Sequence, residues 1–257
     1  MDQELVAQFT TSFAQHGGQY LGGQTINSMA WDGATQVVTI LGDGQIIKSE
    51  KLLVALGRQA NVEDLNLTAA GLQLNAKGSL SVNQYCQTDA PHIYAAGDMV
   101  GAPALASKAM EQGRRSVRHA LNLPIGDALS TIPLGIYTIP EMASIGMDEK
   151  AAGERYRNPI VGRAKFEEIA RAQISGSSDG LLKMIADPRG ERLLGIQIVG
   201  ESATELIHLG QMALQQGAMI ESFINSVFNF PTYAEAYRVA ALDILGQAAK
   251  RDTAAAA

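Results

Sequence analysis

Asp98 is the residue whose type and position most directly suggest chemistry. It follows Gly97 at the end of the apolar run Ile93–Ala96 and precedes a segment of helical composition. A carboxylate at the carboxyl end of a strand, beside a helix start, is well placed to accept hydrogen bonds from sugar-like hydroxyls. The same spacing equally suits a turn in which the aspartate caps the next segment. Spacing alone therefore predicts either a hydroxyl-binding carboxylate or a structural cap.

A second segment, Phe228–Ala236, reads FNFPTYAEA and places a carboxylate close to an aromatic residue and a proline. Thr232 and Glu235 have the spacing of a helix capping box, and Pro231 directly precedes them. A purely structural role as a helix start therefore explains this segment when it is considered alone.

The N-terminal elements that must position these residues are a helix and several strands. Apolar residues at helical spacing predict a helix over 3–16. Two β-rich runs, 25–31 and 35–41, are joined across Asp32-Gly33, which favours a tight hairpin turn. The run Lys51–Leu56 is apolar on both faces and ends at Gly57, a pattern typical of a strand buried inside a parallel sheet.

Beyond residue 61 the chain is irregular as far as residue 87, after which Ile93–Ala96 is predicted as a compact buried strand and 105–121 as a helix. The remainder has the pattern of an α+β layer with an Asp187–Gly190 hairpin turn and a fraying Thr/Ala tail. Its predicted strands are 134–138, 142–146, 159–166, 181–186 and 192–199, and its predicted helices are 201–216, 219–228 and 232–248.

Composition excludes several classes of function. With 257 residues, 46% of them hydrophobic, the chain can bury a sizeable core. Its net charge of -6 disfavours nucleic acid as a partner. No segment has the length of a membrane span or the pattern of a signal peptide, so we expect a cytoplasmic protein. The single cysteine, Cys86, can form neither an internal disulfide nor a redox pair within the chain, and no cluster has metal-ligand spacing.

A longer string around Asp98 resembles a cofactor-binding motif. Gln87–Asp98 reads QTDAPHIYAAGD, and ALAS at 104–107 and AMEQGR at 109–114 follow it. This combination resembles the second FAD-binding motif of the FAD/NAD(P) pyridine nucleotide-disulfide oxidoreductase superfamily. The resemblance implies that Asp98 binds the ribityl chain of FAD. It also implies that a stretch of backbone faces the pyrimidine end of the flavin, where the helix dipole stabilises negative charge; this stretch is Ala104, Leu105, Ala106 and Ser107.

The segment Leu53–Asn61 resembles the strand that closes the NAD(P) domain of the same superfamily, with Gly57 allowing the backbone to approach the nicotinamide nucleotide. A glycine at a strand end is also commonplace, so this motif is weak alone. The two Gly-rich fingerprints of the superfamily are absent from the sequence, and we therefore expect the chain to begin inside the NAD(P) domain. The resemblance implies three parts: 1–60 closing the NAD(P) domain, 61–130 returning to the FAD domain, and 131–257 forming an α+β dimerisation domain. The expected fold class is thus α/β plus α+β, a partial flavoprotein with two dinucleotide-binding domains.

Phe230 distinguishes among members of the superfamily. Dihydrolipoamide dehydrogenases and glutathione reductases carry a histidine at the position that Phe230 takes, and Glu235 corresponds to that histidine's partner. A phenyl ring cannot carry protons, which argues against dithiol chemistry. By resemblance, Pro231 and Thr232 of one subunit approach the flavin of the other, which implies a homodimer.

Further strings, including PLGIYTIPE at 133–141 and VGRAKF at 161–166, resemble the soluble pyridine nucleotide transhydrogenases. These enzymes pass hydride between NADH or NADPH and the other oxidised nucleotide through FAD. Two alternatives stay open: a flavoprotein like dihydrolipoamide dehydrogenase or mercuric reductase, and an inactive dimerisation fragment. A missing N-terminal half is a further expected partner.

Overall fold

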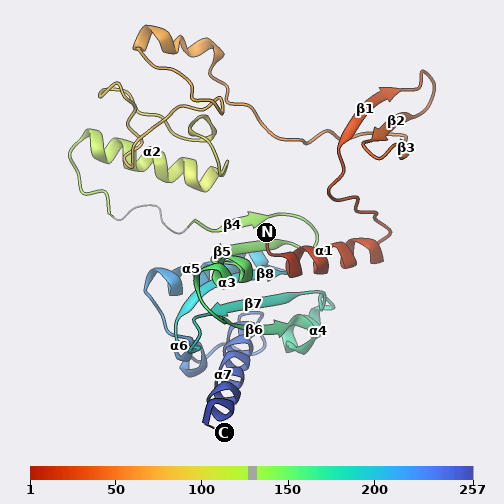
Figure 1. The fold of residues 1–257 in the computed structure, drawn as a ribbon, viewed down its shortest axis with the longest axis vertical. Helices are drawn as coiled ribbons and strands as arrows, with labels where there is room; N and C mark the ends of the chain where they lie inside the picture. Colours follow the sequence, from red (N-terminus) through yellow and green to blue (C-terminus); the bar gives the residue numbers. More distant parts are fainter. Residues whose placement is uncertain (127–131, 257) are drawn as a thin grey trace. The chain divides into compact units, whose positions relative to one another are not determined.

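The computed structural model describes residues 1–126 and 132–256, which form two compact units. Residues 1–20 group with the described chain from 132 onward, and residues 21–126 form the other unit (Figure 1). The N-terminal helix therefore belongs to the same compact unit as the C-terminal sheet, although more than a hundred residues separate them in sequence.

The first unit, here called the C-terminal unit, is built on a five-stranded antiparallel sheet with the order β4-β5-β8-β7-β6. The predicted hairpin turn is confirmed: Asp187 Oδ1 accepts hydrogen bonds from the backbone N–H groups of Glu191 at 2.8 Å and Arg192 at 3.1 Å. All five predicted strands are confirmed to within two residues at either end. They are β4 (Leu134–Ile136), β5 (Met142–Gly146), β6 (Ile160–Lys165), β7 (Leu181–Ala186) and β8 (Leu193–Val199).

Helices cover this sheet and bury its main core (Figure 1). The helices are α1 (Gln3–Gln15), α3 (Glu149–Arg155), α4 (Ala170–Ser175), α5 (Ala203–Gln215), α6 (Ile220–Asn225) and α7 (Glu235–Ala256). Helix α7 packs on β6 and β7, and α5 packs on β5 and β8. The short helices α3 and α4 were not predicted, because six or seven residues hold too little periodic pattern. The prediction that the Thr/Ala tail frays is wrong, because α7 continues to Ala256. Alanine has the highest helix propensity, which favours this continuation.

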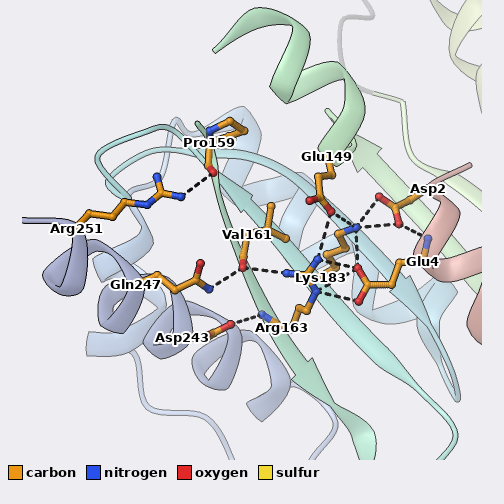
Figure 2. Close-up of polar contacts among 10 residues, drawn as sticks. All are labelled: Asp2, Glu4, Glu149, Pro159, Val161, Arg163, Lys183, Asp243, Gln247 and Arg251. Carbon is orange, nitrogen blue, oxygen red and sulfur yellow. Dashed lines mark hydrogen bonds and ion pairs between the residues drawn. The ribbon is translucent and has the colours of Figure 1, made fainter. Parts of the chain in front are cut away.

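Polar side chains of α7 occupy the open edge of β6 (Figure 2). Asp243 Oδ2 accepts the backbone N–H of Arg163 at 2.9 Å, and Gln247 Nε2 donates to the carbonyl of Val161 at 2.9 Å. Arg251 adds a contact just before the strand, donating from Nη2 to the carbonyl of Pro159 at 3.4 Å. Four helical residues rise about 6 Å and two strand residues about 6.6 Å, so the side chains one turn apart on α7 are spaced nearly as the outward-facing backbone groups of β6 are. The helix thereby satisfies backbone groups that an edge strand otherwise offers to another chain.

An ion cluster attaches α1 to the same sheet (Figure 2). Asp2 caps α1 by accepting the N–H of Glu4 at 2.9 Å. Lys183 of β7 places its Nζ 2.9 Å from Asp2, 2.9 Å from Glu4 and 2.6 Å from Glu149 of α3. The guanidinium of Arg163 donates to both carboxylate oxygens of Glu4. Two cations and three carboxylates thus join β6, β7, α1 and α3.

This cluster predicts an acid-sensitive contribution to stability. The hydrogen bond from Arg163, reinforced by Lys183 and opposed by burial, lowers the pKa of Glu4 from its ordinary 4.5 to about 2. A carboxyl group whose pKa is depressed on folding stabilises the protein above its unfolded pKa, and this contribution is lost as pH falls through the folded pKa. The stability advantage of the native protein over Glu4→Gln should hold above pH 4.5 and shrink between pH 4.5 and about 2. Urea unfolding across this range measures it, and an advantage independent of pH would contradict the assignment.

The second unit, here called the central unit, begins with an antiparallel meander of β1 (Ile26–Trp31), β2 (Val37–Leu41) and β3 (Ile46–Ser49). The predicted hairpin across Asp32-Gly33 is confirmed, and Asp32 Oδ1 accepts three backbone N–H groups in its turn. The irregular stretch that follows contains short 3₁₀ turns at Glu63–Leu65 and Leu67–Ala70, and the predicted helix is confirmed as α2 (Ala106–Ala120).

Two predicted strands of this unit are wrong. Residues 51–56 have no regular secondary structure, and Leu53 and Leu56 are 90% and 75% exposed. A buried strand needs neighbours on both sides, and the described residues place no strand beside this run. Residues 93–96 make only an isolated bridge, Gln87 to Tyr94, although Ala95 is buried. The apolar character of 93–96 instead serves a small core with Leu72 and Leu80.

Candidate functional site

Asp98 presents its carboxylate at the surface of the central unit. It opens a short 3₁₀ turn, Asp98–Val100, directly after Gly97, whose φ of +84° favours glycine. The N–H of Gly97 donates to Gln112 Oε1 of α2 at 2.9 Å, which anchors the turn to the helix. The Asp98 side chain is 35% exposed, and its Oδ2 atom accepts a hydrogen bond from a side chain outside its own turn. A partly exposed carboxylate at this position can accept hydrogen bonds from a bound group, the first of the two roles compatible with the spacing.

The N-terminus of α2 is open toward solvent. Leu105 is its N-cap in an extended conformation and forms no side-chain cap hydrogen bond, while Ala104, Ala106 and Ser107 are exposed. Lys108 holds the preceding loop by donating to the carbonyls of residues 101 and 102 at 3.0 and 3.1 Å. Backbone N–H groups in a first helical turn lack intrahelical partners and carry partial positive charge. This helix start can therefore receive an electron-rich group.

Arg58 meets Asp98 in the structure, and the sequence reasoning missed it. Its Nη1 donates to Asp98 Oδ2 at 3.2 Å, and its side chain is 80% exposed. Gly57, with a φ of +133°, turns the chain immediately before it. The sequence does contain a signal for this contact, because the cationic Arg58 directly follows Gly57. An ion pair this exposed contributes little stability, about 0–1 kcal/mol, so its position matters more than its energy.

The Phe230–Glu235 segment belongs to the C-terminal unit and forms half of a capping box. Glu235 Oε2 accepts the N–H of Thr232 at 3.2 Å, whereas the Thr232 hydroxyl donates to the carbonyl of Asn229 at 2.7 Å. Pro231, which precedes Thr232, is half-buried, and the Phe230 ring is 74% exposed. Glu235 is thus engaged by backbone, and Phe230 presents only hydrocarbon.

Other chemical groups are sparse in residues 1–126 and 132–256. That part of the chain holds no group of three or more histidine, cysteine or acidic residues able to bind a metal ion. Within the same residues, no helix combines the length and apolar character needed to cross a membrane. Cys86 is buried, and burial raises the pKa of its thiol, which keeps it protonated and unreactive.

Two family descriptions together match most of the chain. Pyridine nucleotide-disulphide oxidoreductase matches residues 1–113, and the dimerisation domain of the pyridine nucleotide-disulphide oxidoreductases matches residues 132–241. The chain belongs to the pyridine nucleotide-disulphide oxidoreductase family. The membership implies FAD and NAD(P) as cofactors and a mixed α/β flavoprotein fold with a dimerisation domain.

The similar sequences are transhydrogenases. The chain is 40% identical over 215 residues to the soluble pyridine nucleotide transhydrogenase of Mycobacterium bovis, covering 84% of this chain and 46% of that protein. It is 44% identical over 218 residues to the enzyme of the same name from Klebsiella pneumoniae, covering 82% of this chain and 46% of that protein. The chain therefore spans about half the length of these relatives.

Solved structures agree on the fold. LpdA from Mycobacterium tuberculosis matches with a TM-score of 0.85 at 26% identity, over 94% of this chain and 52% of that one. The HOCl-induced flavoprotein disulfide reductase RclA from Escherichia coli matches with a TM-score of 0.86 at 22% identity, over 94% of this chain and 55% of that one, and this second likeness supports the fold alone.

Proposed function

We propose that this chain is part of a transhydrogenase in which bound FAD takes a hydride from NADH or NADPH and delivers it to the other, oxidised nucleotide. The observation that carries the choice among reactions of the family is Phe230. An exposed phenyl ring stands where dithiol-using members carry a proton-transferring histidine, and hydride exchange between nucleotides needs no such proton carrier. The identity of 40–44% to proteins named transhydrogenases supports the same choice.

The residues of the central unit fit FAD. The partly exposed carboxylate of Asp98 would accept hydrogen bonds from ribityl hydroxyls, and the uncapped start of α2, at Ala104–Ser107, would offer N–H groups and a positive dipole end to the flavin ring. Gly57 leaves room for the nicotinamide nucleotide, since a residue without a side chain allows close approach. The protein's contribution is alignment of the reactants rather than proton transfer.

The proposal includes a homodimer in which Pro231 and Thr232 of one subunit approach the flavin of the other. It also divides the chain into three parts: residues 1–60 belong to the NAD(P) domain, 61–130 to the FAD domain and 131–257 to the dimerisation domain. The dimerisation-domain match supports the assembly. Because the chain spans 46% of the length of this relative, we assign the complete reaction to the whole protein. We propose that the protein is cytoplasmic.

The test is hydride transfer in the FAD-loaded protein from NADPH to thio-NAD⁺, followed by absorbance, with lipoamide plus NADH as the competing assay. Transfer to thio-NAD⁺ without lipoamide reduction supports the proposal. Lipoamide reduction would favour a protein like dihydrolipoamide dehydrogenase. A dimer that shows no flavin bands after incubation with FAD and removal of the free FAD would favour a dimerisation module.

Removing the Asp98 carboxylate should weaken FAD binding. Asp98→Ala deletes an acceptor of hydrogen bonds from the ribityl hydroxyls, and bonds to charged groups contribute about 1.5–3 kcal/mol, which corresponds to a loss of affinity of about tenfold or more. Fluorescence titration with FAD measures it. Asp64→Ala, at an exposed carboxylate in an earlier turn of the same unit, is the matched control and should bind FAD normally. Equal affinity of the two variants would exclude Asp98 from the site.

A further inference from the structure

We propose that Lys183 is a latch that fastens helix α1 to the C-terminal sheet, and that this latch can open to release α1 while the sheet stays folded. Helix α1 lies within residues 1–113, which match the oxidoreductase family description. The sheet from which it would be released lies within residues 132–241, which match the dimerisation domain. The latch would thus control whether helix α1 stays on this sheet.

The geometry of the ammonium group carries the first step. The Lys183 side chain is 2% exposed, and its three N–H donors have three carboxylates within 2.9 Å: Asp2, Glu4 and Glu149 (Figure 2). Two of these come from the first turn of α1, and Asp2 is itself 4% exposed. If α1 leaves, the buried ammonium keeps only Glu149 from α3. Taking two of its three carboxylate partners away from a buried ammonium is costly, so the cluster holds α1 in place.

The second step is that α1 contributes little to the main core. Leu5 is its one fully buried apolar residue, and Leu5 and Phe9 pack in a small cluster with Met142, Leu181 and Val199. The main hydrophobic cluster of the sheet contains no residue of α1. Release of the helix therefore uncovers a small apolar area and leaves the larger core intact, which is the condition for local rather than global opening.

Solvent reaches the latch from one side. A cavity of about 670 Å³ adjoins it, lined by residues 1–4, by Asp148, Glu149 and Lys150 of the α3 start, and by Lys183 itself. The side chains of Glu4 and Glu149 are 37% and 47% exposed, and Arg163 adds a second cation beside Glu4. Water and ions in this cavity can compete for the carboxylates, which makes opening at the α1 side accessible in the folded protein.

Hydrogen exchange on the full chain tests the latch. Lys183→Met keeps an unbranched side chain one atom shorter than lysine but removes its charge, leaving the buried Asp2 carboxylate without its cation. Amides of α1 should then exchange at least about tenfold faster, whereas those of β7 and β8 keep their rates, because opening is local. Lys165→Met is the matched control: Lys165 ends the neighbouring strand β6, and the substitution removes only its exposed pair with Glu167, so α1 should be unchanged.

A second variant covers the case in which Lys183→Met does not fold. The double substitution Asp2→Asn with Glu4→Gln removes the α1 side of the latch and leaves Lys183 paired with Glu149. The same selective acceleration in α1 is expected. Unchanged exchange in α1 in this double variant would overturn the latch. So would equal acceleration in α1 and in β7 and β8, because the cluster would then be an ordinary part of the sheet's core.

Discussion

Replacing Gly162 by alanine is expected to destabilise the C-terminal unit by about 3 kcal/mol, because overpacking at this site has no flexible group to absorb it. Gly162 lies in β6, where α7 crosses it closely. An added Cβ would clash with the carbonyl oxygen of Ala240 and lie 2.7 Å from Ile244 Cγ1. A side-chain atom could rotate away, but the Ala240 oxygen is backbone, so α7 itself would have to shift off the strand.

Gly153→Ala is the matched control for this substitution. Gly153 is an exposed residue of α3, and a Cβ built there has no heavy atom within 4 Å. Alanine favours a helix by up to about 1 kcal/mol over glycine, so this variant should be slightly more stable than the native chain. Urea unfolding followed by circular dichroism compares the two. Equal stability of Gly162→Ala and Gly153→Ala would contradict the close packing of α7 on β6.

Tyr237→Ala is expected to cost about 4 kcal/mol, the usual loss when a large buried aromatic side chain is removed. Tyr237 is fully buried, and its ring stacks on Phe223 with centroids 5.4 Å apart. Its hydroxyl donates to the carbonyl of Leu206 at 2.7 Å and accepts the N–H of Gly210 at 3.1 Å, both in α5. The residue therefore joins α5, α6 and α7 through one side chain.

Tyr237→Phe distinguishes the contribution of the hydroxyl from that of the ring. It should lower stability by about 1–2 kcal/mol, since only the two hydrogen bonds are lost. Burial raises the pKa of Tyr237 well above its usual value, so the hydroxyl stays protonated and this cost should not change between neutral and mildly alkaline pH. Tyr137→Ala, at a ring 81% exposed, should change stability by no more than about 0.5 kcal/mol. Thermal and urea unfolding measure all three. A large loss at Tyr137, or none at Tyr237, would contradict the described core.

The strands of the C-terminal unit and the family motifs were determined by the sequence itself. Short apolar runs bounded by turn residues such as Asp187 and Gly190 are local signals, and so is the string around Asp98. The replacement of a proton carrier by Phe230 is likewise a matter of residue identity. For these features, neighbouring residues carry the information that decides the structure.

Only the tertiary structure decided which distant residues meet. Residues 51–56 look like a strand, yet they remain unpaired because pairing depends on a neighbour and not on the run itself. The contact of Arg58 with Asp98 and that of Asp2 with Lys183 join positions 40 and 181 residues apart. Chain topology brings Arg58 to Asp98, and for Asp2 and Lys183 the cost of leaving a buried charge without a partner adds to it. Neither cause leaves a periodic signature in the sequence.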